Sequence, residues 1–209
     1  MSLAVTMIDY GAGNLHSVKK AFRECGAEVS VTDEPAAVKN AELLVLPGVG
    51  AFADGMRGLR KKHLIEALDC YFARQRPFLG ICLGMQMLLT NSDEFGSHSG
   101  LGVISGQVVR IPTRPDMKVP HMGWSRIRPR PGGSWAGSLL KDTPVGSRFY
   151  FVHSFSAEPE SEENRLADAD YGGFRISAAV RQDNIIGCQF HPEMSGPLGL
   201  ELLRHFLEI

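Results

Sequence analysis

Residues 76–89, with the sequence RPFLGICLGMQMLL, decide the fold. The apolar run after Pro77 predicts a short buried strand that ends at Ile81, and the run after Cys82 predicts the first turns of a helix over residues 83–89. A cysteine between two glycines at a strand-to-helix corner is the Gly-x-Cys-x-Gly form of a nucleophile elbow. Such a corner exposes the thiol at the carboxyl end of the strand, near a helix N-terminus whose partial positive charge favours the reactive thiolate.

A second motif, QFHPE over residues 189–193, offers an imidazole and a carboxylate. His191 and Glu193 are separated by one residue, so on an extended segment their side chains point to the same side. A lone buried cysteine is usually an inert core thiol, and a lone His-Pro-Glu is usually a surface turn. The elbow and the distal pair together predict a catalytic triad of Cys82, His191 and Glu193, in which the carboxylate orients the imidazole base.

The first half of the chain alternates strands with helices. We expect strands over 3–8, 28–32, 41–46 and 76–81, and helices over 15–25 and 56–74. Alternation of this kind implies a mostly parallel central sheet flanked by helices, with the functional side chains at its carboxyl edge.

After residue 100 the pattern changes. Short strand-like runs separated by turn residues occur at 102–111, 118–128, 148–157 and 174–181, and they indicate an antiparallel extension of the sheet. A strand over 185–190 returns to the core, and an amphipathic helix over 198–207 follows it. The sequence therefore predicts an α/β fold in a single domain that spans residues 1–209.

The composition is that of an ordinary globular protein. Of the 209 residues, 44% are hydrophobic and 22% are charged, and the formal net charge is −1. This balance gives no support for binding to nucleic acid or to an anionic membrane surface. No apolar run reaches the length of a membrane span, and the N-terminus lacks a secretory signal. We therefore expect a cytoplasmic protein that binds neither nucleic acid nor membrane.

The four cysteines, at positions 25, 70, 82 and 188, are scattered and show no metal-ligand spacing. They are expected to be free thiols in a reducing compartment. The sequence therefore predicts no metal site.

The elbow, the PGVG loop at 47–50 and the QFHPE motif resemble the class I (triad-type) glutamine amidotransferase family, which implies that family's flavodoxin-like fold. Further segments narrow the resemblance to the glutaminase subunits of imidazole glycerol phosphate synthases. They are DYGAGNL at 9–15, VPHMGW at 119–124 and YFVHS at 150–154. The resemblance covers essentially the whole chain, and PHMGW is the segment that points to this subfamily.

The resemblance implies hydrolysis of the side-chain amide of glutamine, with no metal or organic cofactor. Because amides resist attack by neutral water, the Cys82 thiolate would attack the amide carbon. His191 would protonate the departing ammonia and then activate water to release glutamate from the thioester. The backbone N–H of Leu83, the residue after the nucleophile, is placed to hold the oxyanion. By resemblance, the N–H of Val49 or Gly50 is the second donor.

Four residues are implied by the resemblance to hold the glutamine substrate. Gln86, one helical turn after the nucleophile, would hydrogen-bond the substrate backbone, and Glu94 would pair with its ammonium group. Ser154 and Phe155 would line the pocket through their backbone groups. The residue types leave a second interpretation of Glu94, as a solvated loop charge. His153 is expected to be a core or interface histidine rather than a second base.

The resemblance also implies a partner. A (β/α)8-barrel cyclase would dock over the site to form a heterodimer and receive ammonia internally, because release into water would waste glutamine and protonate the product. Its acceptor would be an amino-imidazole-carboxamide ribonucleotide intermediate of histidine biosynthesis. The products would be imidazole glycerol phosphate and the carboxamide ribonucleotide used in purine synthesis. The residues expected at the partner face are Asn14, His121, Trp124, Tyr150 and Met194.

Two positions depart from the family pattern. Met194 stands where a lysine commonly follows His-Pro-Glu, and Ser125 stands where an asparagine commonly follows Gly-Trp. Both lie on the expected partner face, so the chain could instead be a paralogous glutaminase subunit that serves another synthase. Its acceptor could belong to cell-surface sugar amidination, anthranilate synthesis or pyridoxal phosphate synthesis. The motifs also allow a cysteine hydrolase of γ-glutamyl peptides or a non-catalytic interaction subunit, although the intact triad argues against a non-catalytic role.

Overall fold

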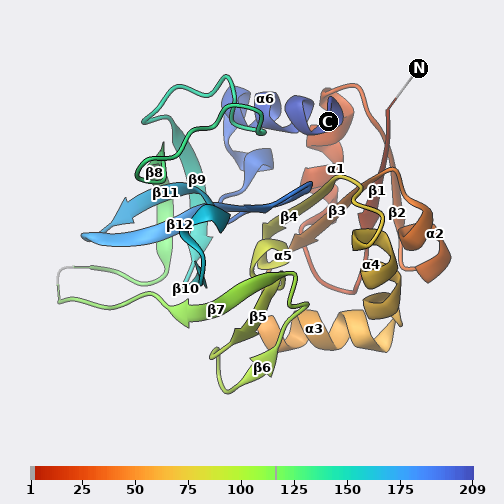
Figure 1. Ribbon diagram of the computed structural model, residues 1–209, viewed down its shortest axis with the longest axis horizontal. Coiled ribbons are helices and arrows are strands. Elements are labelled where there is room, and N and C mark those ends of the chain that lie inside the picture. The colour runs from red at the N-terminus through yellow and green to blue at the C-terminus, as the bar shows by residue number, and fades with distance from the viewer. Residues whose placement is uncertain (1–2, 116) are drawn as a thin grey trace.

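The computed structural model describes residues 3–115 and 117–209 (Figure 1). Its main element is a nine-stranded sheet in the order β2-β1-β3-β4-β13-β12-β11-β8-β9. Five strands are parallel: β1 (Ala4–Ile8), β2 (Glu28–Thr32), β3 (Leu43–Gly48), β4 (Phe78–Cys82) and β13 (Ile185–Cys188). The order of these five strands is that of the flavodoxin-like fold, as the sequence predicts.

Helices cover both faces of the parallel strands. One face carries α1 (Leu15–Glu24) and α6 (Gly196–Leu207), and the other carries α2 (Pro35–Asn40), α3 (Phe52–Lys61) and α4 (Leu64–Phe72). Successive residues of β3 point to opposite faces, so Val45 belongs to the first core and Leu44 and Leu46 to the second. Burial on both faces explains why these strands are unbroken apolar runs.

The remaining strands form an antiparallel extension of the large sheet and a second, mixed sheet. In the large sheet these are β12 (Phe174–Gln182), β11 (Arg165–Tyr171), β8 (His121–Pro129) and β9 (Arg148–His153). A second sheet has the order β10-β7-β5-β6, made of β10 (Phe155–Pro159), β7 (Ile104–Arg110), β5 (Leu89–Ser92) and β6 (His98–Ser99). Two short 3-10 helices, η1 (Glu162–Asn164) and η2 (Pro192–Met194), complete the elements. Because Ser154 alone separates β9 from β10, a single segment passes from one sheet to the other.

Both helices predicted around the elbow differ from those observed. The predicted helix over 56–74 is two helices, α3 and α4, which meet at His63 in the left-handed conformation, with φ 55°. The predicted turns over 83–89 shrink to α5 (Leu83–Gln86), and Leu89 already begins β5. The carbonyls of Met87, Leu88 and Leu89 accept bonds from the segment 101–104. They pair with a neighbouring chain segment and so do not extend the helix.

Three strands in the second half of the chain also differ from the sequence prediction. The run 148–157 is divided between β9 and β10, and β11 was not predicted at all. β11 contains Asp168, and a charged residue in a sequence does not indicate a core strand. Its side chain is nevertheless fully buried. Arg165 and Arg175 compensate the charge, with guanidinium Nε atoms 2.9 and 2.8 Å from the two carboxylate oxygens.

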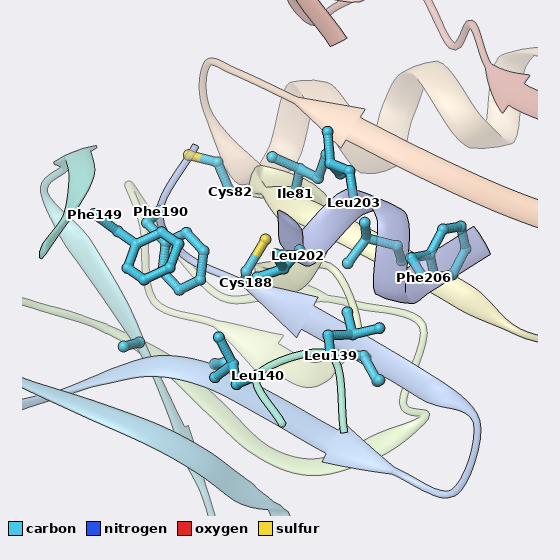
Figure 2. Packing of buried hydrophobic residues seen from close by; sticks show 14 of the residues in the cluster. Ile81, Cys82, Leu139, Leu140, Phe149, Cys188, Phe190, Leu202, Leu203 and Phe206 are labelled. Carbon is cyan, nitrogen blue, oxygen red and sulfur yellow. The ribbon is translucent and has the colours of Figure 1, made fainter. Parts of the chain in front are cut away.

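A cluster of buried side chains supports the end of β4 (Figure 2). Cys82 lies at the margin of this cluster, and Phe190 and Phe149 lie next to one another on one side of it, with ring centroids 4.3 Å apart. Phe190 is fully buried and also contacts Phe151 at 5.6 Å between centroids. This aromatic anchor fixes the backbone of the residues on either side of Phe190, including His191.

Within residues 3–115 and 117–209, no helix is long and apolar enough to cross a membrane. The same described residues contain no group of three or more His, Cys, Asp or Glu side chains that could hold a metal ion.

Candidate active site

The cysteine of the elbow adopts a strained backbone conformation. Cys82 has φ 54° and ψ −107°, in a region that L-residues rarely enter, and it connects β4 directly to α5. The flanking glycines are required by space. A Cβ on Gly80 would lie 2.7 Å from the carbonyl carbon of Gly84, and a Cβ on Gly84 would overlap the carbonyl oxygen of Leu46. The close packing of these backbones holds the thiol at the carboxyl edge of the parallel sheet.

His191 and Glu193 lie beside this thiol. Nδ1 of His191 is 2.8 Å from Oε1 of Glu193, and both side chains are buried. Burial by itself lowers the pKa of His191, but its interactions with the Cys82 sulfur and the Glu193 carboxylate outweigh this effect and raise the pKa to about 10. The ring therefore carries its proton at neutral pH and can pass it to a leaving group.

The other ring nitrogen of His191, Nε2, is not used by Glu193. Nε2 is buried and makes no hydrogen bond to any described residue, while the nearby Cys82 sulfur contributes to the raised pKa of the ring. A loose contact of this kind between nucleophile and base is common before substrate binds. Nε2 is thus free to exchange a proton with the cysteine or with a substrate.

Backbone contacts fix the histidine to the neighbouring strand β9. The N–H of His191 donates to the carbonyl of Tyr150 at 2.9 Å, and its carbonyl accepts from the hydroxyl of Ser195 at 2.6 Å. The same hydroxyl accepts from the N–H of Tyr150 at 3.0 Å. Ser195 therefore clamps the imidazole segment to β9, and no motif in the sequence pointed to it.

A pocket of about 380 Å³ opens next to the thiol. This volume suits a small-molecule ligand. Eight predicted site residues line it together with Val152 and His153: Val49, Gly50, Cys82, Leu83, Gln86, Glu94, Ser154 and Phe155. The structure thus gathers the predicted nucleophile, oxyanion donors and substrate-holding residues around one cavity. The roles of these residues remain predictions.

Glu94 is not the solvated loop charge of the second interpretation. The residue is only 9% exposed, and its Oε2 accepts a hydrogen bond of 2.6 Å from the backbone N–H of Phe52, the first residue of α3. The carboxylate therefore lies at the N-terminus of a helix, where negative charge is stabilised. Its position in the pocket wall leaves it available to a cationic group of a ligand.

Both N–H donors of Gln86 are already used. Its Nε2 donates to the carbonyl of Phe155 at 2.9 Å and to Oε1 of Gln189 at 3.0 Å. An amide nitrogen carries only two donors. Gln86 can therefore contact a substrate only through its carbonyl oxygen, which accepts from an ammonium group and cannot bind a carboxylate.

The predicted partner-face residues divide into two groups. Asn14 is exposed, Tyr150 is half-buried, Trp124 is 51% exposed and Met194 is 46% exposed. His121 differs from the prediction: it is only 1% exposed and cannot touch a partner directly. The alternation of side chains along β8 explains the difference, because Met122 and Trp124 point outward and His121 points inward.

Comparisons with known proteins agree with this arrangement. Residues 6–209 match the family model described as glutamine amidotransferase class-I. The chain is 47% identical to imidazole glycerol phosphate synthase subunit HisH 1 of Legionella pneumophila (strain Lens), over 99% of both chains. It is also 47% identical to subunit HisH of Geobacter metallireducens, over 97% of this chain and 96% of that one.

A solved structure shares the fold at much lower identity. The structure of PurLQS from Thermotoga maritima matches with a TM-score of 0.75 at 20% identity, over 100% of this chain and 99% of that chain. The family model and the HisH relatives cover nearly the whole chain at high identity. The chain therefore belongs to the class-I glutamine amidotransferase family, among the HisH subunits of imidazole glycerol phosphate synthase.

Proposed function

We propose that this chain hydrolyses glutamine to glutamate and ammonia through Cys82, His191 and Glu193. The observation that carries the proposal is a cysteine held at a strained elbow beside a buried imidazole. That imidazole is itself fixed 2.8 Å from a buried carboxylate. A nucleophile, a base and an orienting group in this order are the parts of a covalent acyl-transfer site.

The reaction divides into two steps. The thiol proton has already passed to Nε2 of His191, so the ring enters the reaction as a cation, and the sulfur bonds to the amide carbon. The C–N bond then breaks, and the proton leaves with ammonia. In the second step a water molecule gives a proton to His191 while its oxygen attacks the thioester, and the thiolate departs from glutamate. Water and glutamine are the only substances consumed, so no cofactor is needed.

The oxyanion formed in both steps would be held by two backbone N–H groups. Leu83 supplies one from the first residue of α5, and the loop at Val49 or Gly50 supplies the other. The register of the sheet supports this assignment, because Gly48 at the end of β3 lies opposite Cys82 at the end of β4. The buried carboxylate of Glu94 and the carbonyl oxygen of Gln86 would both receive the substrate ammonium.

We also propose that the ammonia passes to a synthase partner. The relatives are named as subunits of imidazole glycerol phosphate synthase, which supports a cyclase of histidine biosynthesis as the other subunit of a heterodimer. The (β/α)8-barrel form of that cyclase is what the family resemblance implies. Exposed apolar residues near the pocket support docking at this face: Val49 lines the pocket, Met194 follows Glu193, and Trp124 contacts Tyr150. One continuous nine-stranded sheet supports a single glutamine amidotransferase domain over residues 1–209.

The test is glutamate release from glutamine by the purified chain, measured with and without the candidate cyclase and its nucleotide ligand. We expect release to require Cys82 and to rise when the liganded cyclase is added. A rate unaffected by that cyclase but raised by another synthase would replace the proposed partner. Hydrolysis that persists after Cys82 is lost would refute the mechanism.

A further inference from the structure

Gln189 is fully buried beside the nucleophile, and the reaction described above does not use it. Its side-chain Nε2 lies 3.6 Å from the sulfur of Cys82, within the range of a hydrogen bond to sulfur. It is the first residue of the QFHPE motif and follows directly after strand β13.

The orientation of the Gln189 amide follows from its neighbours. The carbonyl oxygen of Phe155 can only accept, so the Gln86 atom 2.9 Å from it must be the amide nitrogen. The same nitrogen lies 3.0 Å from the side chain of Gln189, which must therefore present its oxygen there. The remaining end of the Gln189 amide, its NH2 group, then faces the sulfur of Cys82.

A histidine pair holds the carbonyl on which this orientation depends. Nδ1 of His153 lies 2.7 Å from the Phe155 carbonyl and must donate to it. Burial lowers the pKa of His153 to about 3 and that of His121 to about 4, so both rings are neutral near pH 7. Nε2 of His153 then accepts from Nδ1 of His121 at 3.0 Å, and Nε2 of His121 accepts from the hydroxyl of Ser125 at 2.7 Å. The donor of every hydrogen bond in the series that runs from Ser125 through the two histidines to Gln189 is thus assigned.

We propose that Gln189 is a further catalytic residue: its amide N–H donates to the Cys82 thiolate and stabilises it once the thiol proton has passed to Nε2 of His191. The proposal rests on the proposed glutaminase reaction. The amide gives up no proton itself. It supplies a fixed donor, and hydrogen bonds to an ionised group are stronger than those between neutral groups. The Gln86 amide and the Phe155 carbonyl set its direction.

A purely structural role for Gln189 makes a different prediction. If the amide only filled space and satisfied Gln86, an apolar side chain of similar shape would change stability but not the reactivity of the sulfur. The reactivity of Cys82 toward an alkylating reagent is therefore the measurement that separates the two roles, because it needs neither substrate nor partner.

The experiment uses the full chain with Cys25→Ser and Cys70→Ser, so that alkylation reports on Cys82. Cys70 is exposed, Cys25 is half-buried and Cys188 is buried. Gln189→Leu and Gln189→Met are compared with this parent by their rate of reaction with iodoacetamide at neutral pH. Each should react about tenfold more slowly, the equivalent of about 1.4 kcal/mol of lost thiolate stabilisation. Gln189→Glu should react more slowly still, because it turns a carboxylate oxygen toward the thiolate.

Cys188→Ala is the matched control. Cys188 is the neighbouring buried residue and bonds to the Gly80 carbonyl rather than to Cys82, so its loss should leave the alkylation rate within about twofold of the parent while lowering the melting temperature. In the glutaminase assay with partner, the Leu and Met variants should lose about tenfold in kcat with KM little changed. Thermal melting identifies any variant that does not fold. If one of Gln189→Leu and Gln189→Met fails to fold, the alkylation rate of the other tests the proposal.

Alkylation of folded Gln189→Leu or Gln189→Met at the parental rate would overturn the proposal. Failure of the proposed function is recognised separately. In that case the parent releases no glutamate with any synthase partner, while its Cys82 still reacts with iodoacetamide faster than that of the Gln189 variants.

Discussion

The Nδ1 atom of His191 lies 2.8 Å from Oε1 of Glu193, and neither side chain is open to solvent. A buried carboxylate keeps its charge only when a partner compensates for it. The charged imidazole is that partner, and the pair holds the ring with Nε2 toward Cys82. We therefore expect the same carboxylate to fix the orientation of the base and to stabilise its cationic form.

Cys82→Ser is expected to abolish glutamine hydrolysis and to leave the fold and partner binding intact. The pKa of an alcohol is far above that of a thiol, so at neutral pH the hydroxyl is almost never ionised and is a much poorer nucleophile in a site that is built for a thiolate. The complex with the cyclase should still form product from added ammonium salts, since only the ammonia supply is lost. Assays with glutamine and with ammonium chloride check this, and substantial turnover with glutamine would contradict the assignment.

Glu193→Gln is expected to slow glutamine hydrolysis by a factor on the order of 10² to 10⁴, less than the loss of Cys82, because the carboxylate orients the imidazole and never bonds to the substrate. The amide is nearly isosteric, so the fold should be retained, but the melting temperature should fall because the buried imidazolium loses its charge partner. The measurement is kcat in the activated complex. An unchanged rate would mean that Glu193 has only a structural role, and it would contradict the assignment of a catalytic triad.

Glu94→Gln is expected to raise KM for glutamine about tenfold, the cost of one lost charge interaction of about 1.4 kcal/mol. The Gln oxygen can still accept from the N–H of Phe52, which now lies 2.6 Å from Oε2, so stability should be nearly unchanged. Steady-state kinetics and thermal melting are measured on the same preparation. A large loss of stability with unchanged KM would show that Glu94 only caps α3.

Much of the site could be predicted from the sequence because its chemistry lies in contiguous motifs. The elbow and QFHPE each fix their local backbone. Gly80, Gly84 and Pro77 directly indicate a strand that turns sharply into a helix. The inward position of His121 could not be predicted, since it depends on which face of β8 the rest of the sheet covers. The role of Gln189 depends on contacts with Gln86, 103 residues away in sequence.

The fold shows the same division. The parallel strands are apolar and easy to recognise, while β11 was missed because Asp168 resembles a surface residue until Arg165 and Arg175 are placed beside it. The break between α3 and α4 at His63 also arises from tertiary contacts. Lys62, the residue before it, binds the carbonyl of Asp9 at 2.8 Å and the carboxylate of Asp33 at 3.1 Å.

Acid should destabilise the protein through His121 and His153. Burial lowers the pKa of these rings to about 4 and about 3, below the ordinary value of 6.5. Between these values and pH 6.5, the two rings therefore bind protons in the unfolded chain but not in the folded chain. Their contribution to stability is complete above pH 6.5 and falls as the pH drops from 6.5 toward 3, by at most about 1.4 kcal/mol per pH unit for each ring.

Urea unfolding at a series of pH values measures this effect. The variant His121→Asn/His153→Gln should lose less of its free energy of unfolding between pH 7 and pH 5 than the parent, although it starts from a lower value. Equal slopes for the two proteins would mean that the rings gain protons as easily in the folded state as in the unfolded one.

The isolated chain is expected to be a poor glutaminase that its partner and the partner's bound nucleotide activate. The reason lies in the loop Pro47–Gly50, which pairs with the elbow: Pro47 lies opposite Ile81 and Gly48 opposite Cys82. Gly50 has φ 107°, and a Cβ on Gly48 would overlap the hydroxyl of Tyr10. Two glycines around the 41% exposed Val49 allow the intervening peptide to rotate, so that an oxyanion donor can point away from the site.

The size of the effect follows from the chemistry of the oxyanion. Loss of one donor costs about 2.7–4 kcal/mol, or roughly 10²–10³ in rate, which is enough to keep the free subunit nearly idle. Docking at the face around Trp124 and Met194 would turn the Val49 peptide inward, because this face and the loop lie at the same edge of the sheet. The glutaminase rate of the purified chain, corrected with a Cys82→Ser blank, is compared with the rate in the liganded complex. Full activity without any partner would contradict this prediction and favour a free-standing hydrolase.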